Sequence, residues 1–170
     1  MTLTDLANKY QTDKGTTHSR GELGPQGYTP FYDLLLQGWA RTKFRMLEIG
    51  VAQGGSLRMW RDFFPLAEIF GLDQTKVSVP GCTVITGQQQ DPAVLAILPP
   101  FDLVIDDGGH RFHEHKASFE GIFPKMPSGG LYIIEDLHAP FNNGESREYF
   151  KNLPGADLEC DGRIVVIRKD

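Results

Sequence analysis

The stretch LEIGVAQGGS, residues 47–56, decides the fold class of this chain of 170 residues. An apolar run ends at Gly50, and Leu57, Trp60 and Phe64 share one face of the helical pattern that follows. A strand, a glycine-rich turn and a helix in this order are typical of the first unit of a doubly wound sheet, where glycines let the backbone approach a ligand. We therefore expect an α/β fold with a nucleotide-like ligand at this turn.

Further short apolar runs alternate with helical patterns along the rest of the chain. The expected parallel strands are residues 44–49, 68–72, 83–86, 101–105 and 130–134. Two more strand-like runs, residues 156–159 and 163–168, flank Asp161-Gly162, which indicates a hairpin with a two-residue turn. The pattern predicts a doubly wound, mostly parallel seven-stranded sheet of Rossmann-like type that ends in a C-terminal antiparallel hairpin.

The N-terminal part of the chain precedes this alternation. Residues 3–10 have a helical pattern, and Thr29-Pro30 supplies an N-cap and a first-turn proline for a helix that reaches about Arg41. We expect residues 1–42 to form a helical cap or lid over a core of residues 43–170, in a single compact domain. The role of the loop at residues 11–28 stays open.

Charge and composition restrict the partners and the location. The net charge of −5 and the lack of a dense basic run disfavour nucleic acid as a partner. We expect no membrane association, because no apolar stretch is long enough to span a bilayer and the chain does not start like a signal peptide. Cys82 and Cys160 stand far apart, as is typical of a reducing cytoplasm.

The glycine-rich turn indicates which cofactor the sheet would bind. Its spacing is Gly50-x-x-x-Gly54 rather than G-x-G-x-x-G, and Glu48 stands two residues before the first glycine. A pyrophosphate would meet Glu48, whereas S-adenosylmethionine carries no phosphate and offers an ammonium and a sulfonium. Asp73 follows the second strand and could accept ribose hydroxyls of either ligand. We expect S-adenosylmethionine rather than NAD, bound by this turn, including Ser56, and by Asp73.

Two other residues belong to the expected cofactor side. Gln89 could reach an adenine edge with its amide, or its stretch could cap the helix that begins at Pro92, and both readings stay open. Asp106, at the end of the fourth strand, is assigned to the region of the methionine ammonium.

Carboxylates follow two expected neighbouring strands. Asp106-Asp107 closes the fourth and Glu135-Asp136 closes the fifth, so both pairs should lie at the carboxyl edge of the sheet. Such crowding favours a bound cation, and oxygen ligands suit Mg²⁺, Ca²⁺ or Mn²⁺ rather than Zn²⁺. We expect Asp107, Glu135 and Asp136 to be metal ligands. The alternative is that these residues are helix caps and solvated strand ends.

Histidines near these carboxylates raise the question of the base. His110 follows Asp107 by three residues, and histidine is the side chain that most often serves as a general base, so His110 is the expected base, with Asp107 as the other candidate. His115 should lie near an apolar face and His113 toward solvent, which disfavours a histidine-based zinc site. His138 could contact the acceptor or simply be solvated.

At these positions the chain resembles the metal-dependent sugar O-methyltransferases of macrolide biosynthesis, of the macrocin and mycinamicin type. The resemblance runs from about Leu6 to Leu137 and rests on residues 12–15, 28–32, 47–51, 54–61, 71–73, 105–110 and 129–137. It implies a class I methyltransferase sheet, S-adenosylmethionine at the glycine turn, and Mg²⁺ on the positions of Asp107, Glu135 and Asp136. His110 matches the position proposed as the base.

The chain also departs from this family pattern. Gly109 stands where a serine is usual, and residues 137–143 are not the usual aromatic-rich segment. The expected function is therefore an S-adenosylmethionine-dependent, Mg²⁺-assisted O-methyltransferase for a hydroxyl of a sugar or other vicinal diol, in natural-product or glycan tailoring. An NAD-dependent oxidoreductase and a non-catalytic S-adenosylmethionine-binding module are the alternatives. Acceptor specificity would come from residues 1–42, from the 137–145 loop, or from a neighbouring subunit of a homo-oligomer.

Overall fold

A central sheet organises the computed structural model, which describes residues 1–18, 26–138 and 144–170. Within these residues, seven strands lie in the order β3-β2-β1-β4-β5-β7-β6. The strands are β1 (Arg45–Ile49), β2 (Glu68–Asp73), β3 (Thr83–Thr86), β4 (Leu103–Asp106), β5 (Leu131–Ile134), β6 (Ala156–Glu159) and β7 (Ile164–Arg168). The first five are parallel, whereas β7 is antiparallel to β5 and β6. The predicted fold class is confirmed.

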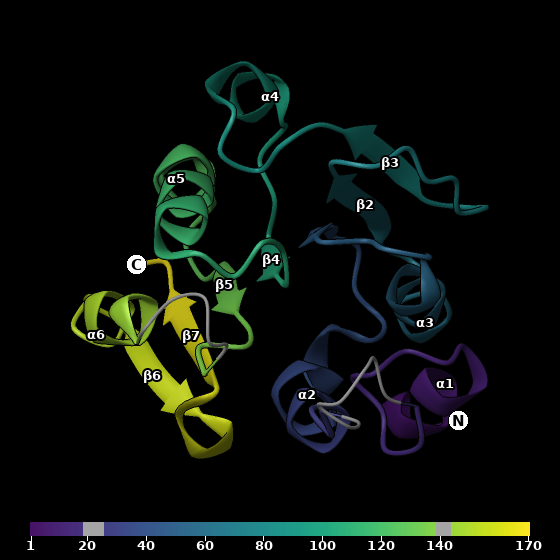
Figure 1. Cartoon of the computed structure of the whole chain (residues 1–170). Coiled ribbons are helices and arrows are strands. Elements are labelled where there is room, and N and C mark those ends of the chain that lie inside the picture. The colour runs from purple at the N-terminus through teal and green to yellow at the C-terminus, as the bar shows by residue number, and fades with distance from the viewer. Residues whose placement is uncertain (19–25, 139–143) are drawn as a thin grey trace.

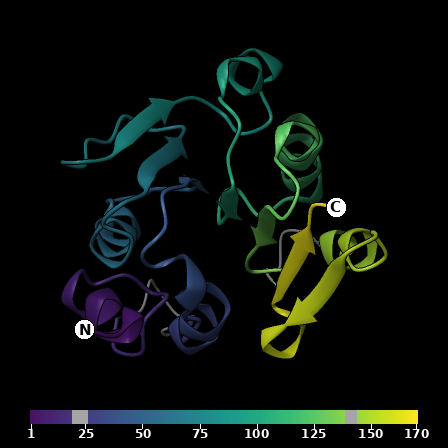
Figure 2. The same cartoon turned by 180° about the vertical axis from the view of Figure 1, so that it is seen from behind.

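Helices cover both faces of the sheet (Figures 1 and 2). They are α1 (Leu3–Lys9), α2 (Thr29–Leu36), α3 (Gly55–Phe63), α4 (Pro92–Ile97), α5 (Phe112–Ile122) and α6 (Glu145–Phe150), with short 3₁₀ turns at Gln37–Trp39, Phe123–Lys125 and Cys160–Gly162. None of the helices described is long and apolar enough to cross a membrane.

Alternation along β1 gives each face its own hydrophobic cluster. Met46 packs with Trp60 of α3, whereas Leu47 packs with Phe119 of α5. A parallel strand that is buried on both faces has a nearly continuous apolar sequence. The apolar residues before Gly50 therefore indicate a strand that leads into the glycine-rich turn. Glu48 interrupts that run. Its side chain faces α3 and accepts hydrogen bonds there from Ser56 and Trp60.

The N-terminal helices share the core of the sheet. Leu3 and Leu6 of α1 and Tyr32 and Leu36 of α2 belong to the same buried cluster as Met46. Helix α2 begins at Thr29 with Pro30 in its first turn, although its N-cap is Tyr28 and it gives way to the 3₁₀ turn after Leu36. Helices α1 and α2 are thus packed into the molecule, and the role of residues 1–42 as a cap stays a prediction.

The terminal hairpin is confirmed, and Asp161-Gly162 forms its turn. Glu159 pairs with Ile164, and the Arg163 N–H donates to the Cys160 carbonyl at 3.1 Å. Asp161 and Gly162 both have a left-handed backbone, with φ values of +57° and +76°, as a two-residue hairpin turn requires. The Arg163 side chain contacts the N-terminal segment, because its guanidinium lies 4.9 Å from the centre of the Tyr28 ring and donates to the Gln26 carbonyl at 3.1 Å.

The register of the strands brings their polar ends together. Ile49 of β1 pairs with Asp106 of β4, which in turn pairs with Ile134 of β5. The residues that follow these strand ends therefore lie at one edge of the sheet, as the sequence predicts for parallel neighbours.

Candidate metal and cofactor site

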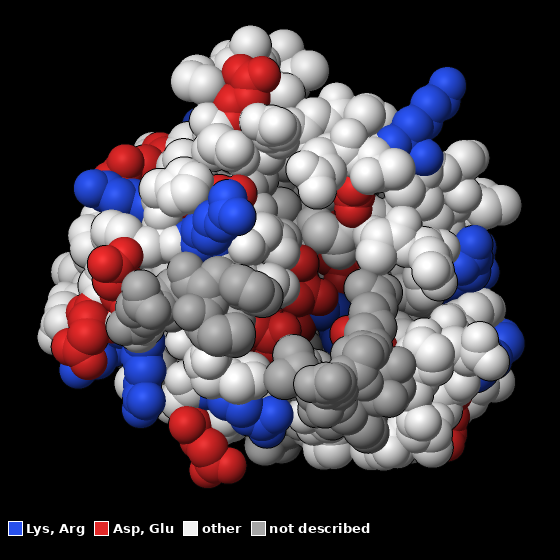
Figure 3. All heavy atoms as spheres, viewed as in Figure 1, with Lys and Arg blue, Asp and Glu red and all other residues white. Residues whose placement is uncertain are grey.

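A cavity of about 530 Å³ opens at the carboxyl edge of the sheet. One end is lined by Gly50, Asp73 and Gln89, and the other by Asp107, His110 and Asp136. Figure 3 shows carboxylates gathered in a hollow of this face. The volume is within the range of small-molecule sites.

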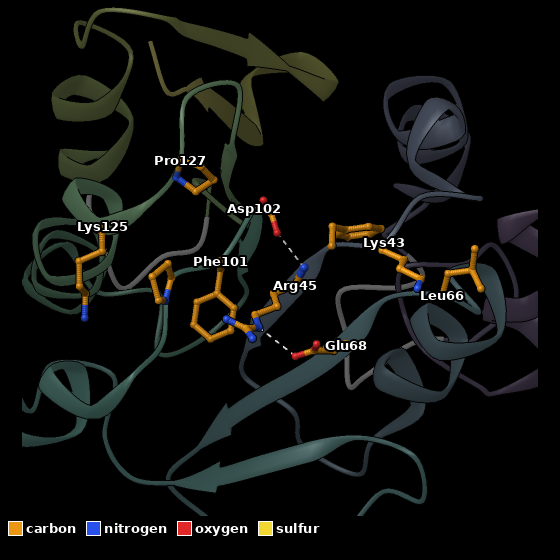
Figure 4. Close-up of a pocket in the computed structure, with 10 residues that line it drawn as sticks. Lys43, Arg45, Leu66, Glu68, Phe101, Asp102, Lys125 and Pro127 are labelled. Atoms are coloured by element: carbon orange, nitrogen blue, oxygen red, sulfur yellow. Dashed lines mark hydrogen bonds and ion pairs between the residues drawn. The ribbon is translucent and has the colours of Figure 1, made fainter.

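A second cavity, of about 430 Å³, lies at the opposite edge. Figure 4 shows Arg45 at its centre, where its side chain donates to Glu68 at 2.9 Å and its backbone N–H donates to Asp102 at 2.8 Å. None of the predicted site residues lines it. The carboxyl-edge cavity is therefore the candidate site.

The cofactor end is built around Gly50 and Asp73. Gly50 has a φ of +87°, and a Cβ there would lie 2.0 Å from the Asp107 carbonyl oxygen, so no larger residue fits. The Asp73 carboxylate accepts from the backbone N–H groups of Val51 and Ala52, each at 2.9 Å, and of Thr75 at 2.7 Å. Asp73 therefore fixes the shape of the glycine-rich turn and also lines the cavity.

Other predicted cofactor residues lie beneath the cavity surface. Glu48 is fully buried and accepts from Ser56 at 2.6 Å and from Trp60 at 3.1 Å. Gly54 has a φ of +78° and packs against Val79. Glu48, Gly54 and Ser56 do not line the cavity, so their cofactor-binding role stays a prediction. Burial, opposed by a nearby lysine, raises the pKa of Glu48.

Asp106 is buried as well, and it organises the loop that carries His110. It accepts from Ser118 at 2.5 Å, from Tyr132 at 3.0 Å and from Gln89 Nε2 at 3.0 Å. The Gln89 Oε1 in turn accepts from the Gly109 N–H at 2.7 Å. The prediction that residues 88–91 cap the helix beginning at Pro92 is confirmed, because Asp91 is the N-cap of α4 and its side chain accepts from the Ala93 N–H at 2.9 Å. Gln89 itself braces the 108–110 loop. Contacts of Asp106 and Gln89 with a cofactor stay predictions.

Three side chains converge at the other end of the cavity. Single atoms of Asp107, His110 and Asp136 lie within 4.8 Å of one another, as a metal site requires. His110 Nε2 is 3.9 Å from Asp107 Oδ1 and 4.0 Å from Asp136 Oδ2. His110 and Asp136 both have a left-handed backbone, with φ values of +59° and +55°, which is uncommon outside glycine and concentrates at functional sites.

The third predicted ligand, Glu135, is not part of this converging group. Its carboxylate is buried and accepts from Tyr32 at 2.5 Å and from Lys14 at 2.7 Å. Burial, opposed by Lys14, raises its pKa well above the usual range. Asp107 and Asp136 are thus brought together with His110, and metal ligation by Glu135 stays a prediction.

Lys14, Tyr28 and Tyr32 escaped the sequence analysis as site residues. Lys14 Nζ donates to Asp107 Oδ2 at 2.6 Å, and Tyr28 donates to Asp136 Oδ1 at 2.6 Å. A signal existed, since residues 12–15 and 28–32 carry part of the family resemblance, but nothing local in the sequence places them beside strand ends about a hundred residues away. Although burial alone lowers the pKa of Lys14, the surrounding carboxylates raise it well above its usual value.

The remaining histidines follow the expected pattern. His115 is buried, with Nδ1 2.9 Å from Ser146 Oγ, and burial lowers its pKa. His113 and His138 are exposed. His115 is not part of the metal-competent group found among the described residues, so the histidine zinc site remains disfavoured.

The chain is similar in sequence to proteins of known activity. No protein-family model matches the chain. Demethylmacrocin O-methyltransferase of Streptomyces fradiae and mycinamicin VI 2''-O-methyltransferase of Micromonospora griseorubida are each 38% identical over 150 residues, which cover 79% of this chain. The chain belongs to the macrocin and mycinamicin O-methyltransferase family. It spans 36% of the length of these two relatives.

Solved structures agree with this family and with its class I methyltransferase fold. The MycE methyltransferase of the mycinamycin pathway, in complex with Mg and SAH, superimposes with a TM-score of 0.80 at 29% identity, over 99% of this chain and 55% of that one. A second MycE structure, with Mg, SAH and mycinamycin VI, matches at the same TM-score with 30% identity over 54% of that chain. Because the relatives are much longer than this chain, their names do not establish which reaction it catalyses.

Proposed function

We propose that this protein is an S-adenosylmethionine-dependent, Mg²⁺-assisted O-methyltransferase that acts on a hydroxyl of a sugar or other vicinal diol. One observation carries the proposal. A single cavity joins the glycine-rich turn and Asp73 at one end to Asp107, His110 and Asp136 at the other. A methyl donor and an activated hydroxyl need this kind of shared, pre-organised space.

The donor side of the proposal rests on Gly50 and Asp73. Gly50 lets the backbone approach a ligand closely, and Asp73 stands at the end of β2, where an acidic residue accepts ribose hydroxyls in related folds. The MycE complexes with SAH support the same choice. Glu48, although buried, adds negative charge below the turn, which disfavours a pyrophosphate.

The metal side rests on the donor set. Asp107 Oδ1 and Asp136 Oδ2 face the same space, while the second oxygen of each carboxylate is already held by a donor from the N-terminal segment. Oxygen donors of this kind fit Mg²⁺, and Asp107 and Asp136, with Glu135 as a third candidate, would hold it. When bound, the cation would orient acceptor oxygens and lower the pKa of a hydroxyl.

His110 is the proposed base. Its Nε2 faces the carboxylate oxygens and would accept the hydroxyl proton as the acceptor oxygen forms its bond to the methyl carbon. The bond from that carbon to sulfur breaks, and the sulfonium becomes a thioether. Asp107 is the weaker candidate, because Lys14 already holds its Oδ2.

Further parts of the proposal concern partners and location. We infer a small-molecule hydroxyl acceptor, in keeping with the names of the curated relatives, and a sugar is the favoured class. A cytoplasmic location and the lack of a nucleic-acid partner remain proposals that rest on composition, and assembly into a homo-oligomer remains a proposal as well.

Calorimetric titration tests the cofactor. Wild-type protein should bind S-adenosylhomocysteine and should not bind NAD(H), each measured with and without Mg²⁺. Binding of NAD(H) alone would favour an oxidoreductase, and binding of neither would refute the proposal. A screen of glycosylated acceptors with S-adenosylmethionine then separates an enzyme from a non-catalytic binding module, because His110→Ala should lose methyl transfer while it still binds S-adenosylhomocysteine.

A further inference from the structure

Lys14 lies at the centre of the carboxylates that follow the strands. Its Nζ is 2.6 Å from Asp107 Oδ2, 2.7 Å from Glu135 Oε2 and 3.7 Å from Glu48 Oε1. Its side chain is only 1% exposed. Lysine is almost never buried so completely unless it is paired, and removal of one partner of a buried pair is strongly destabilising. The Lys14 ammonium therefore places a positive charge of the protein itself among these carboxylates.

The backbone around Lys14 holds this cation in place. The Lys14 carbonyl accepts from the Thr29 N–H at 3.2 Å, and the flanking Asp13 and Gly15 carbonyls accept from residues 26 and 27 at 2.7 and 3.0 Å. A Cβ on Gly15 would lie 2.6 Å from the Asn8 side chain, so this turn also packs closely on α1. These contacts fix the backbone position from which the Lys14 side chain reaches the carboxylates.

The donors from the N-terminal segment divide the carboxylate oxygens in a consistent way. Lys14 takes Asp107 Oδ2 and leaves Oδ1 facing His110 Nε2 at 3.9 Å. Tyr28 takes Asp136 Oδ1 and leaves Oδ2 facing the same nitrogen at 4.0 Å. One oxygen of each carboxylate is thus anchored, and the other is presented to the cavity. Groups that hydrogen-bond to metal ligands in this manner fix their orientation.

We propose that Lys14 is a positioning residue of the metal site, which pairs with the buried Glu135 and holds Asp107 in the arrangement that binds a divalent cation. The proposal rests on the function proposed above. It makes the N-terminal segment a working part of the site in addition to any role as a cap, because the cation-binding geometry depends on a side chain from residues 12–15.

The sign of one effect separates positioning from simple charge balance. If Lys14 only offsets negative charge, its removal leaves the cluster more negative, and a divalent cation should bind more tightly. If Lys14 positions the ligands, its removal should weaken binding by about 10- to 100-fold, the usual effect of losing a group that orients metal ligands.

The experiment measures Mn²⁺ binding by the electron paramagnetic resonance signal of the free ion, with Mg²⁺ competition. Lys14→Met removes the charge and keeps most of the aliphatic stem. Lys14→Arg keeps the charge but replaces the compact ammonium with a planar, larger group. Lys9→Met is the matched control, because Lys9 lies in the same segment, is 48% exposed and pairs with Asp62 at 3.4 Å, outside the cluster.

Both Lys14 variants should bind Mn²⁺ at least 10-fold more weakly than wild type, and Lys9→Met should match wild type. Circular dichroism identifies variants that fold, and Lys14→Arg carries the test if Lys14→Met does not. Wild-type or tighter binding by a folded Lys14 variant overturns the inference and leaves the proposed function standing. If the wild-type chain binds no divalent cation, the metal-assisted function fails and this inference fails with it.

Discussion

The hydroxyl of Tyr32 offers a test of how tightly the N-terminal segment is tied to the site. Tyr32 is fully buried, its hydroxyl is 2.5 Å from Glu135 Oε1, and its ring meets Trp60 edge-on at 5.3 Å between centroids. Tyr32→Phe keeps the ring contacts and leaves a buried carboxylate oxygen without this donor. A buried acceptor that loses its donor costs about 1–3 kcal/mol, so the unfolding free energy should fall by about 2 kcal/mol.

Tyr10→Phe is the matched control for this substitution. Tyr10 also donates to a carboxylate at 2.5 Å, but its partner Asp62 lies at the surface. Surface substitutions usually change stability by less than about 0.5 kcal/mol. Urea denaturation in the presence of EDTA should therefore show a large loss for Tyr32→Phe and a small one for Tyr10→Phe. Equal losses, or a stable Tyr32→Phe, would refute the reasoning that burial of Glu135 makes its donors important.

Three further predictions follow from the site. Gly50→Ala should destabilise the fold by at least about 1–2 kcal/mol, the cost of a left-handed residue, with a further cost from the clash with the Asp107 carbonyl, and thermal unfolding measures it. Gln89→Ala should leave the Gly109 N–H and Asp106 without their amide partner, so methyl transfer should fall about 10-fold or more while secondary structure persists by circular dichroism. Because burial raises the pKa of Glu135 above its reference value of 4.5, the folded chain retains a proton that the unfolded chain loses, so this group's contribution to stability falls as pH rises above about 4.5. Metal-free urea midpoints from pH 5 to 8 should therefore fall less steeply for Glu135→Gln than for wild type, and parallel curves would contradict the shift.

The fold could be predicted because its signals are local. The apolar runs before Gly50 and Asp107 mark buried parallel strands, and parallel strands necessarily place their carboxyl ends at one edge. The hairpin turn could be predicted for the same reason, because Asp161-Gly162 has the residue types that a left-handed two-residue turn favours. The contact of Arg163 with Tyr28 joins distant parts of the chain, and local sequence does not indicate such a contact.

The same distinction between local sequence signals and distant contacts applies to the site residues. Asp107, His110 and Asp136 were found because they follow adjacent strands, and the structure brings them together. Glu48 and Asp106 are polar residues at the same edge, yet they face inward and accept hydrogen bonds from the protein itself, Glu48 from Ser56 and Asp106 from Ser118. Lys14 is the reverse case. It lies in a loop of polar residues, and its role depends on hydrogen bonds to carboxylates that are 93 and 121 residues away.

The central claim is that Asp107 and Asp136 hold a divalent cation beside His110, and one titration tests it most directly. Mn²⁺ is titrated into wild type, Asp107→Asn, Asp136→Asn and Glu114→Gln, the last being a carboxylate that lines the same cavity outside the converging group. Wild type and Glu114→Gln should bind Mn²⁺, and both Asp variants should bind it at least about 10-fold more weakly. Unchanged affinity in Asp107→Asn and Asp136→Asn would contradict the claim.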